Sequence, residues 1–213
     1  MSNPEGTQKL QNGMPSLADL DASLRSKRFL SNVLGINSPP TSQGTQLADG
    51  FVHLEQKALI EYEALRITLT AFLENGIAED FHRAQDHAET CVNTLHRCIE
   101  YLDRLRSLGF RRADGSPYVP RARELAVLRD DRRRAVRKMR DLLEHIDADI
   151  LGGRVAPGGD VTVCPTFELL QLGPAVLSYV QMADNIRLLH SFAVELSEVR
   201  ITVANAPPSS ANG

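Results

Sequence analysis

The feature that most constrains this chain is the recurrence of apolar residues at three- and four-residue steps over long stretches. An α-helix completes a turn in about 3.6 residues, so side chains at this spacing share one face that can be buried. The spacing holds over residues 51–73, 79–108, about 121–150 and 178–199, and Gly or Pro residues separate these stretches. The sequence therefore predicts an all-α fold, an up-and-down bundle of about four long helices.

The segment before the last predicted helix differs in composition from the helical stretches. Residues 154–173 place β-branched Val and Thr between Gly and Pro, a mixture that disfavours a helix. We expect a short irregular insert or a hairpin there. Elsewhere Leu and Ala dominate the apolar set, aromatic residues make up only 5% and Trp is absent, which agrees with a helical core.

The N-terminal part of the chain is predicted to be a flexible segment over residues 1–47. Residues 1–15 are polar and contain Gly and Pro, and residues 36–48 have the Pro/Ser/Gly composition of a linker. Between them, residues 16–34 have the apolar spacing of an amphipathic helix with Ser16 at its N-cap. The sequence leaves open whether this helix docks on the domain or folds only with a partner.

The rest of the chain is predicted to be one helical domain over residues 48–201, followed by a disordered tail over residues 202–213. Cys91, Cys98 and Cys164 form no metal-type CxxC pair, so we expect reduced thiols, no metal site and no cofactor. No apolar run approaches the roughly 20 residues of a membrane span, and no secretory signal begins the chain. With a net charge of −3, these features predict a cytoplasmic protein with no membrane partner.

The predicted helix over residues 121–150 carries the most informative charge pattern. Between Arg121 and Arg140 there are nine basic residues and three acidic ones. On an ideal helix an apolar stripe falls within about 60° of Met139; it consists of Leu125, Leu128, Ala135, Val136, Leu142, Leu143, Ile146 and Ile150. One flank, at about 80° to 160°, is basic; it consists of Arg129, Arg133, Arg137 and Arg140.

This basic flank has two interpretations. Guanidinium groups match phosphate oxygens, so arginines that rise a turn at a time can follow an RNA backbone. On this interpretation Arg129, Arg133 and Arg137 bind RNA. Alternatively the arginines form a solvated helix face supported by neighbours four residues away, such as Arg140 with Glu144.

His145 lies off the apolar stripe, at about 240° on the same helix. An imidazole in such a position can exchange protons near neutral pH, and Asp141, one turn earlier, is placed to fix its tautomer. A histidine that moves a proton and an arginine that stabilises a phosphorane are the minimum for metal-free RNA cleavage. Arg140, Asp141 and His145 are therefore the predicted catalytic residues. On the last helix, His190 is expected to be an ordinary surface residue.

The stretch Arg140-Asp141-Leu142-Leu143-Glu144-His145 resembles the R-x4-H motif of the HEPN (higher eukaryotes and prokaryotes nucleotide-binding) superfamily, with Asp141 at its polar position. The longer stretch RDLLEHIDADILGG is similar to the end of the motif helix in a bacterial HEPN-like nuclease group. The resemblance implies a helical bundle that acts as a metal-independent endoribonuclease, as a toxin or an anti-phage defence effector. It implies that His145 acts on the ribose 2′-hydroxyl or the leaving oxygen and that Arg140 binds the scissile phosphate.

The same resemblance implies RNA as the substrate, a 2′,3′-cyclic phosphate as the product, and a homodimer whose two motifs face each other. It also implies an antitoxin or another regulatory protein as a partner. Two other functions remain open from the residues alone. One is a catalytically silent HEPN-like module that binds RNA, nucleotides or protein, and the other is a plain helical interaction protein. Cleavage requires Arg140 and His145 to open onto a shared groove, whereas Arg140 paired only with Glu144 favours the plain interaction protein.

Overall fold

The computed structural model describes residues 4–35, 39–111, 115–120, 124–155 and 161–197. Within these residues the chain is mostly helical, as predicted, with a small antiparallel sheet inserted before the last helix. The helices in chain order are α1 (Pro4–Gly13), α2 (Leu24–Val33), α3 (Ser42–Asn75), α4 (Ala78–Ser107), α5 (Asp130–Leu151) and α6 (Tyr179–Ser197). The predicted disordered tail, residues 202–213, lies outside the described part of the chain.

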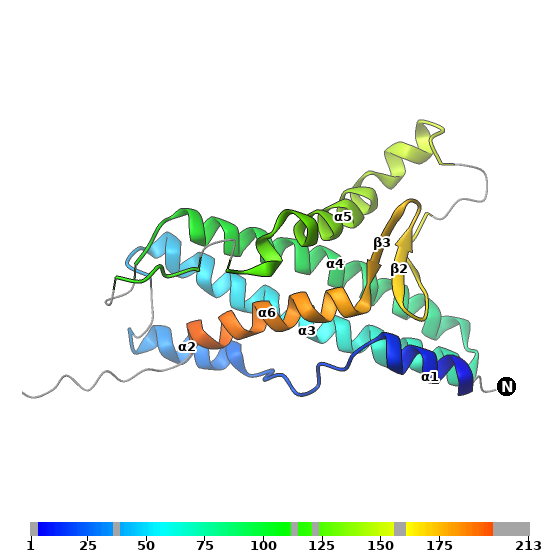
Figure 1. Cartoon of the computed structure of the whole chain (residues 1–213), viewed down its shortest axis with the longest axis horizontal. Helices are drawn as coiled ribbons and strands as arrows, with labels where there is room; N and C mark the ends of the chain where they lie inside the picture. The colour runs from blue at the N-terminus through cyan, green and yellow to red at the C-terminus, as the bar shows by residue number, and fades with distance from the viewer. Residues whose placement is uncertain (1–3, 36–38, 112–114, 121–123, 156–160, 198–213) are drawn as a thin grey trace, which may run out of the picture.

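Helices α3 and α4 form a long antiparallel hairpin at the centre of the core (Figure 1). The Thr41 hydroxyl caps the start of α3 by accepting a hydrogen bond from the N–H of Gly44 at 3.1 Å. At the other end Gly76 adopts a left-handed conformation with φ of 68°, which stops α3 where the sequence predicts. The buried face of α4 follows the predicted spacing and includes Ala84, Ala88, Cys91, Leu95, Cys98, Leu102 and Leu105.

Helix α5 begins nine residues later than predicted, at Asp130 instead of Arg121 (130 − 121 = 9). A short 3₁₀ turn, η1 (Ala126–Leu128), precedes it, and Arg129 is extended with ψ of 147°. Asp130 and Asp131 occupy the first turn of α5, where a carboxylate interacts favourably with the positive end of the helix dipole. The predicted stripe residues Leu125 and Leu128 are therefore buried, but they reach the core from this turn and not from the helix.

The insert before α6 is a β-hairpin with one additional short strand. Strands β2 (Leu169–Leu172) and β3 (Ala175–Ser178) pair antiparallel, and β1 (Cys164–Pro165) pairs with the outer edge of β2. Gly173, with φ of 52°, lies in the two-residue turn between β2 and β3, where a left-handed residue is required. The Ser178 hydroxyl then accepts a hydrogen bond from the N–H of Gln181 and caps α6.

The N-terminal region is part of the folded body, which corrects the prediction of a flexible segment over residues 1–47. Residues 4–13 form α1, and the side chains of Leu10, Met14 and Leu17 are buried in the main core. The helix expected over residues 16–34 is shorter, α2, and it contacts α3 and α6. Buried apolar side chains dock the first part of this region, and hydrogen bonds from Arg28 and Asn32 to Asp49 hold α2 on α3.

The four long helices run in alternating directions, as expected of an up-and-down bundle (Figure 1). Helix α5 packs on α4 and on strand β3, and its C-terminal end projects past the hairpin, away from the other helices (Figure 1). Helix α6 lies across α3, with α2 beside them at one end and α1 along α3 at the other. Among the described residues, no helix combines the length and apolarity needed to cross a membrane.

Candidate functional site

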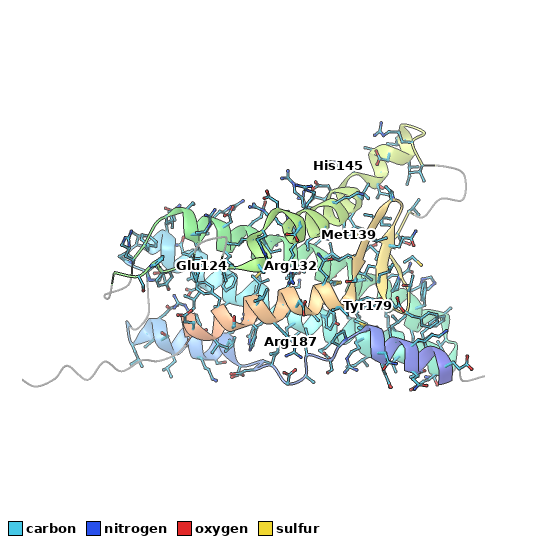
Figure 2. The ribbon with its side chains drawn as sticks, in the orientation of Figure 1. Glu124, Arg132, Met139, His145, Tyr179 and Arg187 are labelled. Carbon is cyan, nitrogen blue, oxygen red and sulfur yellow. The ribbon has the colours of Figure 1, made fainter. Side chains whose placement is uncertain are left out.

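The candidate site lies on α5, whose two halves differ in how far they are covered by the bundle. Val136 and Met139 in the first half are buried, whereas Ile150 and Leu151 near the end are 46% and 89% exposed. Figure 2 shows His145 on the projecting part of the helix and Met139 further along it toward the body. The apolar stripe predicted for the whole helix therefore packs on the core as far as Leu142 and Leu143 and is exposed at Ile150.

The predicted basic flank is divided by the structure. Arg129 precedes the helix, and the Nη1 of Arg133 donates a hydrogen bond to Asp103 on α4 at 3.0 Å. The Nε of Arg137 lies 3.5 Å from a carboxylate oxygen of Asp141. The arginines proposed to bind RNA thus do not form one continuous row, because Arg133 faces α4 and Arg129 lies outside the helix.

Arg140 pairs with two carboxylates of its own helix. Its Nη1 donates to Asp141 at 3.1 Å, and its Nη2 forms an ion pair with Glu144. Asp141 is consequently held between Arg140 and Arg137. The expectation that Asp141 orients the imidazole of His145 is wrong in this structure, because the carboxylate bonds with guanidinium groups instead.

His145 is exposed, and it forms no hydrogen bond or ion pair with any residue in the described ranges. It opens onto a groove of about 640 Å³ along the outer side of α5, whose lining includes Arg134, Arg137, Lys138 and Asp141. Lys138 also donates to the carbonyl oxygen of Pro174 in the β2–β3 turn at 3.1 Å. The groove therefore places an imidazole that has no partner among the described residues beside four cationic side chains, Arg154 being the fourth, and beside the carboxylates of Asp141 and Asp149.

Arg140 lies on the other side of the helix, toward α4. There His96 is almost fully buried, and its Nε2 lies 3.9 Å from a carboxylate oxygen of Glu100. Burial lowers the pKa of His96, Glu100 opposes this effect, and the positive charge of Arg140 reinforces it. Arg140 is not among the residues that line the groove of His145. Of the two motif residues, His145 opens onto a groove, and Arg140 is held at the seam between α4 and α5, so the two do not share a groove in this structure.

Sequence reasoning missed a second histidine site inside the core. The Nδ1 of His190 on α6 lies 2.9 Å from a carboxylate oxygen of Glu55 on α3, and both side chains are buried. His190 was expected on the surface. Burial raises the pKa of Glu55, and the hydrogen bond with His190 opposes the shift. The only signal in the sequence is that Glu55 follows Leu54 within an apolar stretch, which does not identify its partner.

Within the described residues, no three His, Cys, Asp or Glu side chains converge as ligands would around a metal ion. The cationic groove on α5 has the chemistry to hold a phosphate group, because guanidinium and ammonium groups donate hydrogen bonds to its oxygens. In comparisons with known proteins, the chain matches no family model, no curated protein and no solved structure.

Proposed function

We propose that this chain is a metal-independent endoribonuclease of HEPN type that binds RNA along α5 and leaves 2′,3′-cyclic phosphate ends. The observation that supports the proposal best is the exposed imidazole of His145, which has no partner among the described residues and opens onto a groove with Arg134, Arg137 and Lys138. A free imidazole can accept the proton of a ribose 2′-hydroxyl or protonate the leaving 5′-oxygen. The neighbouring cations stabilise the charge that develops on the phosphate.

In this mechanism the 2′-oxygen attacks the adjacent phosphorus, the bond from phosphorus to the 5′-oxygen breaks, and the cyclic phosphate forms. His145 takes the proton from the 2′-hydroxyl and delivers it to the leaving 5′-oxygen, and Arg137 and Lys138 hold the non-bridging oxygens. Arg140 reaches the phosphate only after it exchanges the carboxylate of Glu144 for a phosphate oxygen. Such an exchange is feasible because the pair is partly exposed, and partly exposed ion pairs contribute little to stability.

A second copy of the chain completes the proposed site. The projecting end of α5 carries apolar side chains that the bundle covers only partly or not at all: Leu142, Leu143, Ile146, Ile150 and Leu151. Burial of such a face against its symmetry mate is favourable and places the two motif helices side by side. The role as a toxin or anti-phage effector, and an antitoxin or other regulatory partner, rests on the HEPN resemblance.

The second candidate function is a catalytically silent HEPN-like module that binds RNA, nucleotides or a protein. The observation that favours it is the pairing of Arg140 with Asp141 and Glu144, which occupies the guanidinium that cleavage requires. In this case the groove cations still bind phosphate groups, and His145 contributes contact without proton transfer.

The deciding experiment is incubation of the purified protein with total RNA in EDTA, beside the His145→Ala and Arg140→Ala variants. We expect the wild type to cut RNA and leave cyclic phosphate ends, and both variants to lose about 100- to 10,000-fold in rate. His82→Ala is the matched control, since His82 is exposed on α4 and bonds only Gln85 among the described residues. Circular dichroism checks that all variants are folded.

The outcomes separate the two candidate functions. If the wild type binds labelled RNA but cuts none, the chain is the silent module. If His145→Ala cuts as fast as the wild type, the motif is a coincidence. If neither binding nor cleavage is found, α5 does not act on RNA and the plain interaction protein remains.

A further inference from the structure

Helix α2 turns its polar side toward the body and its apolar side outward, which is the reverse of the other helices. The side chains that it buries are Leu24, Arg28 and Ser31, so two of its three buried residues are polar or charged. Its outward face is apolar instead: Phe29 is 70% exposed, Leu30 50%, Val33 65% and Leu34 55%. Exposed apolar groups in a contiguous cluster are characteristic of a binding surface.

Polar contacts to two other helices hold α2 in this orientation. The Nε of Arg28 donates to Asp49 on α3 at 2.8 Å, and its Nη1 donates to the carbonyl oxygen of Leu196 on α6 at 2.9 Å. The amide of Asn32 donates to both carboxylate oxygens of Asp49 at 2.8 Å. Rotating α2 about its axis to bury its apolar face would break all of these bonds. The carboxylate of Asp49 would then lose the donors that Arg28 and Asn32 supply.

A groove of about 210 Å³ runs between α2 and α3 beside this face. Phe29 and Val52 supply apolar walls, and Arg25 and His53 lie at its rim. The groove continues the apolar surface of α2 toward α3, so a partner that covers α2 also reaches the polar side chains of α3.

Basic residues from three helices lie at or near this groove: Arg25 and His53 line it beside the ion pair of Arg28 and Asp49, and Lys57 and Arg97 lie near His53. Arg25 on α2, His53 and Lys57 on α3, and Arg97 on α4 are exposed, and none forms an ion pair in the described ranges. They lie near enough to one another that the charges of Arg25, Lys57 and Arg97 reinforce the effect of burial in lowering the pKa of His53. An unneutralised cationic border beside an apolar face is complementary to a partner with apolar and acidic groups.

We propose that this surface, formed by the outward face of α2 and its cationic border, docks an acidic amphipathic helix of a partner protein. Apolar side chains of the partner pack over Phe29, Leu30 and Val33, and its carboxylates face Arg25, Lys57 and Arg97. Helix α2 has 10 residues, about 15 Å in length, which matches roughly three turns of a partner helix.

Two other occupants fit less well. A second copy of this chain would bring the same cationic border against itself under two-fold symmetry, and like charges would oppose each other. A flat lipid surface would cover the outer face of α2 but would leave the concave groove beside α3 unfilled. A helix fills the groove and neutralises its border at the same time.

The test is a selection of displayed 15-residue helical peptides, of random composition on every face, against the full chain. We expect the selected peptides to combine an apolar stripe with Asp or Glu on one flank. By fluorescence anisotropy they should bind the Arg25→Glu, Lys57→Glu, Arg97→Glu variant at least about tenfold more weakly than the wild type. Peptides in which the acidic residues are replaced by Lys should instead prefer this variant.

Two further variants control the experiment. Lys9→Glu with Arg83→Glu reverses exposed charges near α1 and the start of α4, at the other end of the molecule (Figure 1), and it should bind the peptides like the wild type. Phe29→Ser with Val33→Ser should abolish binding, and circular dichroism should show an intact fold because both side chains are exposed. The Arg25→Glu, Lys57→Glu, Arg97→Glu variant and the Phe29→Ser, Val33→Ser variant should both keep the RNA cleavage of the wild type. This proposal can therefore fail or hold independently of the nuclease.

Three results would overturn the proposal. The first is a selection that yields no binders, or only binders that are insensitive to the charge reversal. The second is sedimentation with phosphatidylserine vesicles that depends on Phe29 and Val33, which would assign the surface to lipid. The third is dimerisation that the Phe29→Ser, Val33→Ser variant abolishes, which would assign it to a second copy.

Discussion

A histidine lies near carboxylates in two regions of the molecule, the core between α3 and α6 and the outer side of α5. The two regions use these residue types differently. In the core, His190 bonds Glu55 at 2.9 Å, and both side chains are buried. On α5, His145 has no hydrogen-bond or ion-pair partner among the described residues, while the nearby Asp141 and Glu144 pair with Arg140. The first arrangement joins two helices, and the second leaves an imidazole available to a ligand.

Burial therefore decides whether a histidine is structural or available for chemistry. A buried carboxylate has no water to solvate it, so a nearby imidazole becomes its obligatory partner. An exposed carboxylate is solvated and pairs with whichever cation lies nearest on its helix, and on α5 that cation is an arginine. The predictions below test this contrast.

The largest effect is expected at the buried pair. His190→Ala leaves Glu55 buried without its partner, which should lower the free energy of unfolding by about 3 to 5 kcal/mol. Urea denaturation followed by circular dichroism measures the loss. Ser191→Ala, at an exposed position beside it, is the control. A loss below about 1 kcal/mol would mean that the pair does not hold α6 on α3.

The second prediction concerns pH. Burial raises the pKa of Glu55 above its ordinary value of 4.5, so the native state binds this proton more tightly than the unfolded chain. The stabilisation is complete below 4.5 and is lost as pH rises through the raised value, by at most about 1.4 kcal/mol per pH unit. Glu55→Gln should remove this fall. The measurement is the difference in unfolding free energy between wild type and variant across pH, and a flat difference would contradict the raised pKa.

A smaller effect is expected for the ion pair of Arg140 and Glu144. A double-mutant cycle with Arg140→Ala and Glu144→Ala should give a coupling of about 0.3 to 0.5 kcal/mol, because both side chains are partly exposed. The matched control is the cycle for Glu100 and Arg104, which have the same spacing on α4. A coupling well above 1 kcal/mol would show that Arg140 is held firmly, and it would favour the silent module over the nuclease.

The smallest effect on stability is expected at His145. His145→Ala should change the free energy of unfolding by no more than about 0.5 kcal/mol, because the imidazole is exposed and contacts no partner among the described residues. Thermal and urea denaturation check this. A large loss of stability would place His145 with His190 as a structural residue, and the contrast between the two regions would disappear.

The periodic segments of the chain were predictable, and the positions of their polar side chains were not. The spacing of Ala84, Cys91, Leu95 and Leu102 predicted α4 and its buried face, because the repeat of a regular helix does not depend on contacts with other parts of the chain. The late start of α5 escaped prediction because apolar spacing continues through Leu125 and Leu128 although the backbone there forms a 3₁₀ turn. A periodic pattern shows which side chains are buried but not which backbone buries them.

Features that depend on the local chain were predictable. The sequence predicted the helical class, the ends of helices at Gly76 and before Gly152, and an irregular insert or a hairpin between α5 and α6, because these depend on local backbone preferences and apolar spacing. It also placed His145 off the covered side of its helix.

The tertiary packing determines which charges meet. It docked α1 and α2 on the body, turned the apolar face of α2 outward, paired His190 with Glu55 and turned Arg140 toward α4. Each of these depends on contacts between residues of different helices or on the ends of those helices. Such contacts are set by the packing of the whole chain, and a local pattern carries no information about the partner on the other side.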